Sequence, residues 1–380
     1  ADAGTGASAS GSIILTFNEK VLQGKGDITL GEEVLTGRFG SSNAIFAYAG
    51  LTYGQAYTVT VPAGAIVDQS GNAFAGITFT FTVMNKVQPA AKLFDAIVSK
   101  DSTTWAGTLG YATIKEAIDA APANSGTPYL IYIKAGRYNE HLQIDKRNIH
   151  LIGEGADKVI ITDNRLSGST TDPSVPAEKQ NLHVSQSATV VVNGSDFFAE
   201  GISFENDWGV SKLAGPQALA LYTVGDKVIL HKCKLRSYQD TYLTTYSQPD
   251  YRHYLKDCFI EGAVDFIYGG GDVFFDACTI YINRDAGGYI TAPSHAAETK
   301  WGYIFMNNTI DAPKSTLVYF GRPWQNKPKV SFVNTKLGKN VSIYGAGWYE
   351  TMGAIPAIFA DYNTMDWEGN PVDLSNRNDY

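Results

Sequence analysis

The sequence predicts an all-β protein in which a right-handed parallel β-helix follows a small immunoglobulin-like β-sandwich. The first observation is a repeated frame, Leu-x-x-Cys-x-Leu at 230–235, which returns 25 residues later as Leu-x-x-Cys-x-Ile at 255–260 and three more times further on. Periods of this size indicate a solenoid of stacked coils. The second observation is composition: the units are rich in Val, Ile, Phe and Tyr and interrupted by Gly, Asn and Asp, which favours strands over helices.

Residues 12–84 predict the sandwich, and residues 1–11 before them are expected to be a flexible N-terminus. Apolar and polar residues alternate in short segments, from Ile13–Phe17 to Ile77–Val83. About seven such strands in so short a segment are typical of an immunoglobulin-like domain. Residues 85–91 lose the alternation and contain a proline, so a linker is expected there. The β-helix is then expected to occupy residues 92–380.

A short amphipathic helix is expected near the start of the β-helix. From Thr113 to Pro122, apolar residues recur at helical spacing after a capping Thr and before a Pro. This helix is expected to cover the open end of the solenoid, where an unpaired coil would expose its core and edge. Strands resume at Tyr129, a long loop is expected at 166–180, and the chain after Trp324 is expected to add one or two weaker coils and fold back along the solenoid.

Charge and hydropathy exclude some classes of partner. The formal net charge of −8 argues against nucleic acid, which requires a basic surface. No apolar run approaches the ~20 residues that span a bilayer. The opening residues, ADAGTGASASG, look like the start of a processed chain. We therefore expect a secreted monomer, extracellular or periplasmic.

The three cysteines, Cys233, Cys258 and Cys278, share one position of the repeated frame. Stacked positions of this kind could allow one disulfide, and buried free thiols are equally consistent with the sequence. No Cys/His spacing of a zinc site is present. The sequence therefore predicts neither a metal nor another cofactor.

Two aspartates occupy equivalent places in successive repeats. Asp240 and Asp265 each stand ten residues after the first residue of their own frame. Because equivalent residues of adjacent coils lie ~4.8 Å apart, the two should be neighbours on one surface. Carboxylates that close cannot both ionise easily, so one should hold a proton while the other stays charged. That would give an acid and a nucleophile in one site, although either aspartate alone is as well explained by a turn.

Four sequence blocks resemble a known family. GPQALAL, SYQDTYL, GAVDFIYG and YFGRPW, in that order, look like the signature blocks of pectin methylesterases, carbohydrate esterases built on a right-handed β-helix. The resemblance runs from about Leu93 to near the C-terminus. The segments TFNEKV and TVPAGAIVDQSGN resemble bacterial Ig-like domains attached to secreted polysaccharide-acting enzymes. The resemblance of the four blocks implies a pectinesterase that hydrolyses galacturonate methyl esters in pectin, releasing methanol and leaving pectate.

The resemblance also implies a role for each matching residue. The nucleophile of the family falls on Asp265, and its general acid/base falls on Asp240. Gln217 and Gln239 match the two glutamines that hold the oxyanion and the developing intermediate. Arg322 matches the arginine that pairs with the nucleophile, and a guanidinium within reach lowers the pKa of a carboxylate.

Aromatic residues near these blocks are candidates for sugar binding. Trp324 matches the aromatic wall that the family presents to the sugar. Phe266, Tyr242, Tyr246 and Tyr268 are expected to add stacking surface, although each is equally consistent with plain packing.

Other functions remain open at the level of sequence. β-Helices also host pectate lyases and polygalacturonases, and two carboxylates about 5 Å apart would suit a retaining glycosidase. Cleavage of the backbone would shorten the polymer, whereas an esterase leaves its length unchanged. A non-catalytic polysaccharide-binding solenoid is the third alternative, disfavoured by the four intact blocks.

Overall fold

The chain divides into two compact units, Ala1–Lys92 and Leu93–Tyr380. The expected linker at 85–91 lies outside the described residues. In the described part of the chain, no helix is long and apolar enough to cross a membrane. The computed structural model describes residues 5–84, 93–101, 108–169, 171–246 and 248–378.

The first unit is a β-sandwich of short strands. Its strands are β1 (Thr5–Ala7), β2 (Gly11–Thr16), β3 (Val21–Gln23), β4 (Thr29–Leu30), β5 (Glu33–Val34), β6 (Gly37–Phe39), β7 (Asn43–Tyr48), β8 (Ala56–Val61), β9 (Ile66–Asp68) and β10 (Ile77–Val83). A five-stranded sheet has the order β1-β10-β8-β4-β5, and a three-stranded sheet has the order β2-β7-β6. Phe46 and Val59 are buried in its core. The predicted sandwich is confirmed, and within the segment 1–11 that was expected to be flexible, β1 pairs in parallel with β10.

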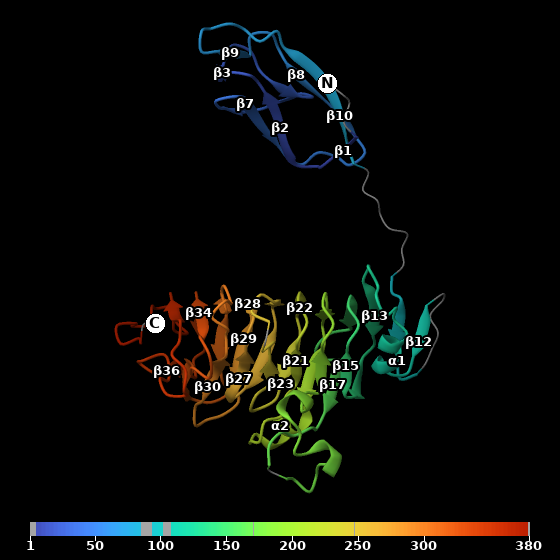
Figure 1. The fold of residues 1–380 in the computed structure, drawn as a ribbon, viewed down its shortest axis with the longest axis vertical. Coiled ribbons are helices and arrows are strands. Elements are labelled where there is room, and N and C mark those ends of the chain that lie inside the picture. Colours follow the sequence, from blue (N-terminus) through green and yellow to red (C-terminus); the bar gives the residue numbers. More distant parts are fainter. Residues whose placement is uncertain (1–4, 85–92, 102–107, 170, 247, 379–380) are drawn as a thin grey trace. The chain divides into compact units, whose positions relative to one another are not determined.

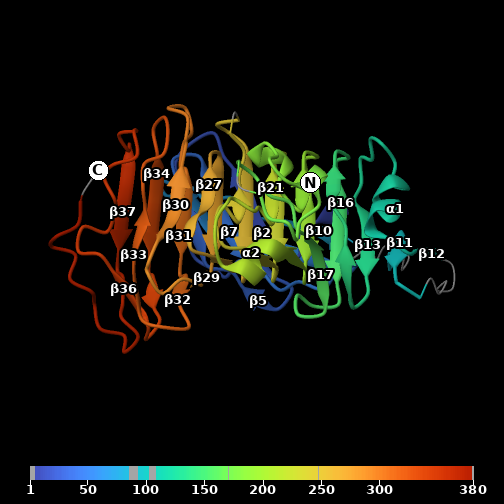
Figure 2. The same ribbon diagram turned by 90° about the horizontal axis from the view of Figure 1, so that it is seen from below.

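The second unit is the predicted parallel β-helix, built from three parallel sheets. From β13 onward its coils follow one another in sequence order to β37 at the far end, whereas β12 and β11 lie beyond β13 at the other end (Figure 1, Figure 2). The first sheet contains, in spatial order, β12 (Leu109–Tyr111), β11 (Ala96–Val98), β13 (Tyr129–Ile133), β16 (Ile149–Gly153), β19 (Phe198–Glu200), β22 (Val228–His231), β25 (Arg252–Lys256), β28 (Asp272–Asp276), β31 (Tyr303–Met306), β34 (Lys329–Val333) and β37 (Ile358–Tyr362).

The other two sheets have eight strands each. The second sheet contains β14 (Gly136–Asn139), β17 (Val159–Asp163), β20 (Ser203–Asn206), β23 (Lys234–Arg236), β26 (Phe259–Gly262), β29 (Thr279–Ile282), β32 (Thr309–Asp311) and β35 (Lys336–Leu337). The third sheet contains β15 (Leu142–Ile144), β18 (Val190–Val192), β21 (Leu221–Thr223), β24 (Tyr242–Leu243), β27 (Val264–Gly269), β30 (Tyr289–Pro293), β33 (Thr316–Gly321) and β36 (Val341–Ile343).

The repeated frame forms columns inside the solenoid. Leu230 pairs with Leu255, Leu255 with Phe275, and Phe275 with Phe305, and all four side chains are fully buried. The rings of Phe275 and Phe305 stack with centroids 4.2 Å apart. The 25-residue repeat of the sequence is therefore one coil of the β-helix.

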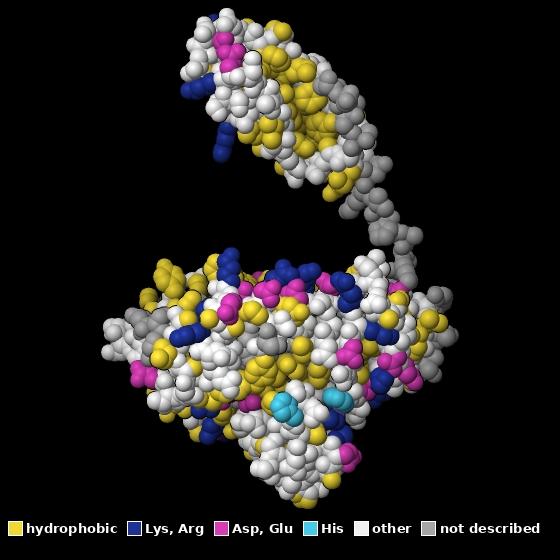
Figure 3. All heavy atoms as spheres, viewed as in Figure 1, with side chains coloured by type: hydrophobic (Ala, Val, Ile, Leu, Met, Phe, Trp, Pro, Cys, Tyr) yellow, Lys and Arg dark blue, Asp and Glu magenta, His cyan; other side chains and the backbone are white. Residues whose placement is uncertain are grey.

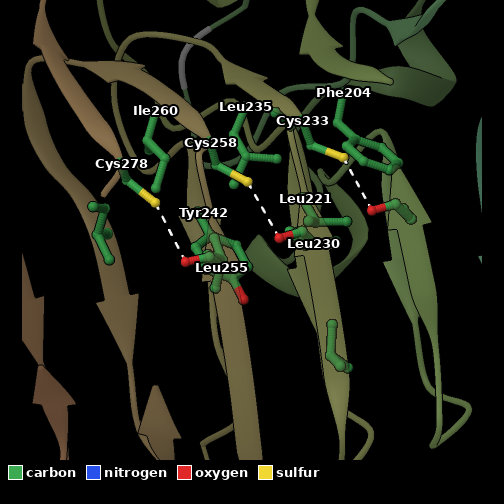
Figure 4. Close-up of a cluster of buried hydrophobic side chains, with 14 of the residues drawn as sticks. Phe204, Leu221, Leu230, Cys233, Leu235, Tyr242, Leu255, Cys258, Ile260 and Cys278 are labelled. Carbon is green, nitrogen blue, oxygen red and sulfur yellow. Dashed lines mark hydrogen bonds between the residues drawn. The ribbon is translucent and has the colours of Figure 1, made fainter. Parts of the chain in front are cut away.

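The cysteines form a second column in the core. Cys233, Cys258 and Cys278 are buried free thiols. Each Sγ donates a hydrogen bond to a backbone carbonyl of the preceding coil at 3.4 Å (Figure 4). The sequence allowed either buried free thiols or one disulfide, and the structure confirms the buried free thiols.

The predicted helix is α1 (Ile114–Asp119), and it covers the first coils. Thr113 caps it, and Glu116 completes a capping box. Ile114 and Ile118 are buried in the solenoid core. The strands β11 and β12 precede this helix and extend the first sheet beyond β13, an extension that the sequence reading missed.

A loop and a short helix form a projection beside the early coils of the β-helix (Figure 1). The expected loop at 166–180 includes the 3₁₀ helix η1 (Ala177–Lys179), and η2 (Val184–Gln186) follows it. The helix α2 (Asp207–Lys212), which the sequence reading missed, packs against this loop because Trp208 donates its Nε1–H to Asp172 at 2.9 Å.

The C-terminal segment closes the far end of the solenoid. Trp348 is buried and stacks on Phe359 with ring centroids 4.2 Å apart. Phe359 lies on β37, which pairs with β34 as the last strand of the first sheet. The weaker coils expected after Trp324 are therefore present, and the segment around β37 adds a rung to the β-helix instead of folding back along its side.

Candidate active site

The two aspartates lie in register in adjacent coils. Gln239 forms a parallel bridge with Val264, and the Asp240 N–H donates to the Val264 carbonyl at 3.2 Å. Asp240 and Asp265 have φ angles of 60° and 50°, a left-handed conformation that is uncommon for residues other than glycine. A register shift between Val264 and Ile267 marks an irregularity in β27. Irregularities of this kind re-aim side chains, and here they accompany the carboxylate pair.

Burial separates the two carboxyl groups chemically. Asp240 is 8% exposed and Asp265 is 7% exposed. Burial raises the pKa of Asp240, and the charge of Asp265 raises it further, to well above its ordinary value. Burial also raises the pKa of Asp265, but hydrogen bonds and charge from Arg322 oppose that rise. Asp265 is thus the carboxyl group that ionises first, and Asp240 holds the proton.

Arg322 binds Asp265 with two parallel hydrogen bonds. It directly follows β33, and its Nε and Nη2 atoms lie 2.8 Å and 2.5 Å from the two carboxylate oxygens of Asp265. Bidentate pairs of this kind fix geometry as well as charge. The guanidinium also lies over the ring of Tyr289, 4.1 Å from its centroid. The sequence analysis did not predict Tyr289, because only the register of the third sheet, in which Tyr289 pairs with Val264 next to Asp265, brings it to the site.

The two glutamines occupy adjacent coils beside the carboxylates. The Ala218 N–H donates to the Gln239 carbonyl at 3.2 Å, so Gln217 and Gln239 are close along the axis of the solenoid. Both side chains are half-buried. A Cβ atom on Gly215 would stand 2.8 Å from Gln239 Oε1. The missing side chain at Gly215 therefore leaves the space that the Gln239 amide occupies.

An apolar strip runs beside the carboxylates, on the face of the third sheet opposite the core. Trp324 covers it, with its ring 5.8 Å from Tyr268 and 5.5 Å from Tyr246. Figure 3 shows hydrophobic side chains gathered across the middle of the β-helix, above the projection. Aromatic surface next to polar groups suits the faces and hydroxyls of sugars. Its members, paired in register from β18 to β30, are Val191, Tyr222, Leu243, Tyr268 and Ala292.

Two of the expected sugar-stacking residues lie elsewhere. The side chains of Tyr242 and Phe266 point into the core and are 0% exposed to solvent, so the expectation that they offer stacking surface is wrong. The reason is strand alternation, since successive residues point to opposite faces. Leu243, the neighbour of Tyr242, points to the strip instead. Tyr268 lies on the correct face beside Asp240, but it is 2% exposed beneath Trp324.

Among the residues that the structure describes, no group of three or more His, Cys, Asp or Glu side chains could hold a metal ion. The site described here consists of carboxyl, guanidinium, amide and aromatic groups.

A solenoid with a carboxyl pair, a paired arginine and an aromatic strip on one face defines a class, the β-helical enzymes that act on polysaccharides. The family model described as Pectinesterase matches residues 95–380, and the model described as Bacterial Ig-like domain matches residues 1–83. The chain therefore belongs to the pectinesterase family and carries an additional Ig-like domain.

Sequence relatives agree with this assignment. A pectinesterase of Petunia integrifolia is 34% identical over 293 residues, which cover 72% of this chain and 73% of the relative. The probable pectinesterase/pectinesterase inhibitor 17 of Arabidopsis thaliana is 35% identical over 277 residues, which cover 70% of this chain and 49% of the relative. This chain thus spans about half the length of the Arabidopsis relative.

Solved structures agree on the fold. Pectin methylesterase PemA from Erwinia chrysanthemi superposes with a TM-score of 0.63 at 27% identity, covering 76% of this chain and 93% of that protein. The pectin methylesterase from Aspergillus niger gives a TM-score of 0.61 at 31% identity, covering 76% and 90%. The predicted β-helix of the pectinesterase type is confirmed.

Proposed function

We propose that this pectinesterase-family chain hydrolyses the methyl esters of galacturonate units in pectin with Asp265 as its nucleophile. The observation that carries the proposal is the pairing of Asp265 with Arg322 beside a second carboxyl group, Asp240, that holds its proton. One ionised and one protonated carboxyl group are what a nucleophile and a general acid require.

In the first step an Asp265 oxygen attacks the ester carbonyl carbon. The carbonyl π electrons move to its oxygen, and the amide of Gln217 or Gln239 supplies a neutral hydrogen-bond donor to the resulting oxyanion. When the bond to the methoxy oxygen breaks, Asp240 gives that oxygen its proton, and methanol leaves. The galacturonyl group is then joined to Asp265 as an anhydride.

In the second step water hydrolyses the anhydride. Asp240, now ionised, takes a proton from the water as the water oxygen attacks the galacturonyl carbonyl carbon. The bond to the Asp265 oxygen breaks, and Asp265 leaves as a carboxylate that Arg322 stabilises. The product is a free galacturonate unit in an unshortened chain, and both aspartates return to their starting protonation states.

The proposed esterase activity also implies a polymer substrate and a cellular location. We propose methyl-esterified homogalacturonan as the polymer that lies along the strip next to Trp324, and a secreted, monomeric enzyme that meets it outside the cell. Pairing with nucleic acid remains disfavoured by the net charge of −8.

The test follows methanol and polymer length together in one reaction on highly methylated pectin. The wild-type protein is expected to release methanol while the polymer keeps its length. Asp265→Asn, which preserves shape and removes the nucleophile, is expected to remain folded and to lose about 10³-fold or more in activity. Shortened polymer would instead indicate the glycosidase or lyase alternative, and binding without any product would indicate the non-catalytic one.

A further inference from the structure

A group of four tyrosines lies beside Arg322, two on strands of the third sheet and two in the segment that follows β36. Tyr289 on β30 pairs in register with Tyr319 on β33, and their rings stack with centroids 5.6 Å apart and planes 11° apart. Tyr319 stacks in turn on Tyr344, at 4.0 Å and 12°. Tyr349 meets Tyr289 and Tyr319 edge-on, at 5.3 Å and 5.4 Å. The ring of Tyr289 is therefore held from two directions.

The guanidinium of Arg322 lies over the ring of Tyr289. Its central carbon is 4.1 Å from the ring centroid, well within the ~6 Å at which a cation is attracted to an aromatic face. The same guanidinium makes both hydrogen bonds to Asp265. Arg322 therefore has two fixed partners, a carboxylate and an aromatic ring.

We propose that Tyr289 is a positioning residue, whose ring fixes the plane of the Arg322 guanidinium so that both hydrogen bonds to Asp265 persist. It acts through Arg322 and does not touch the reacting atoms. The other tyrosines of the group keep the Tyr289 ring from turning. This inference rests on the proposed role of Asp265 as the nucleophile.

The chemical reason is that a bidentate pair depends on orientation. A guanidinium free to rotate keeps its charge near Asp265 but presents one hydrogen bond instead of two. The charged and titratable groups that act on Arg322 are Asp265, Tyr289 and Asp240. Of these, only the ring of Tyr289 contacts the guanidinium without competing for its hydrogen bonds.

The test compares Tyr289→Leu with Tyr289→Phe, because phenylalanine keeps the aromatic face and loses only the hydroxyl. The readout is kcat and KM for methanol release as a function of pH. Tyr289→Leu is expected to lower kcat about tenfold, with a smaller change in KM, and to move the acid limb of the pH profile upward by about half a unit to one unit. Tyr289→Phe is expected to stay within about threefold of wild type, with its acid limb in place.

A control variant separates positioning from general damage. Tyr281→Leu removes a half-buried tyrosine from β29 of the second sheet, where it packs on Phe259, and is expected to leave the pH profile unchanged. If Tyr289→Leu does not fold, Tyr289→Met takes its place. An acid limb that stays fixed in the Leu or Met variant, or activity lost equally in Tyr289→Phe, would overturn the inference. A wild-type protein that releases no methanol, or an active Asp265→Asn, would overturn the proposed function instead.

Discussion

Replacing Arg322 by glutamine tests how the site keeps Asp265 ionised. In the wild-type protein the guanidinium opposes the effect of burial on the Asp265 pKa through bonds of 2.8 Å and 2.5 Å. Charge-assisted hydrogen bonds contribute about 1.5–3 kcal/mol. Because one pKa unit corresponds to about 1.36 kcal/mol, their loss should raise the Asp265 pKa by about one to two units.

The sign of the effect on activity follows from the role of Asp265. A nucleophile must be ionised, so activity is lost as pH falls through its pKa, and a higher pKa moves that loss to higher pH. The assay is kcat/KM for methanol release across pH, for the wild type, Arg322→Gln and Arg322→Lys. We expect the acid limb to move upward by about one to two pH units in Arg322→Gln. Arg322→Lys should move it less, because lysine keeps the charge but cannot bind both oxygens.

Thermal unfolding of each variant provides the control for folding. A profile of Arg322→Gln whose acid limb coincides with that of the wild type, or lies below it, would refute the reasoning. It would mean that the ionisation of Asp265 does not depend on its arginine.

Three further predictions follow from burial in the β-helix. Asp240→Asn should reduce methanol release by about 10²–10⁴-fold. Above about pH 4 this variant should also be more stable than the wild type, because the raised pKa of Asp240 lowers the wild-type free energy of unfolding there. A difference in stability between variant and wild type that is the same at pH 4 and pH 7 would contradict this. Trp348→Ala should lower the free energy of unfolding by about 3–5 kcal/mol in denaturant titrations, since the ring is 1% exposed and closes the core. The thiols of Cys233, Cys258 and Cys278 should react with a thiol reagent only after denaturation; rapid reaction of the native protein would contradict their burial.

The sequence predicted the solenoid and the aspartate pair because both depend on one period. Asp240 and Asp265 share an offset from their frames, and a parallel ladder turns that offset into adjacency. No period predicts which way a side chain points beside a backbone irregularity. Phe266 lies within the register shift of β27, and Tyr242 alternates with Leu243 on β24, so both side chains point into the core and were assigned to the wrong face.

Contacts between distant coils were the other limit. Arg322 donates a hydrogen bond to Asp265, which lies 57 residues earlier in the sequence, and its guanidinium lies over the ring of Tyr289. The spacing of these residues in the sequence does not show that β30 lies between β27 and β33, and only the register of the third sheet shows it. Helix α2 was missed for a related reason. Its six residues carry a weak helical pattern, and the contact of Trp208 with the distant Asp172 helps to hold it.

The central claim is that Asp265 becomes covalently joined to the galacturonyl group. It is tested most directly by quenching a single turnover of a methylated oligogalacturonide with hydroxylamine and locating the product by peptide mass spectrometry. An anhydride at Asp265 predicts a hydroxamate on the peptide that contains Asp265, formed in step with methanol release and absent from Asp265→Asn. Hydroxylamine can also cleave the anhydride at the galacturonyl carbonyl, so methanol release with no hydroxamate on either that peptide or the galacturonyl group, or with the hydroxamate on Asp240, would contradict the account.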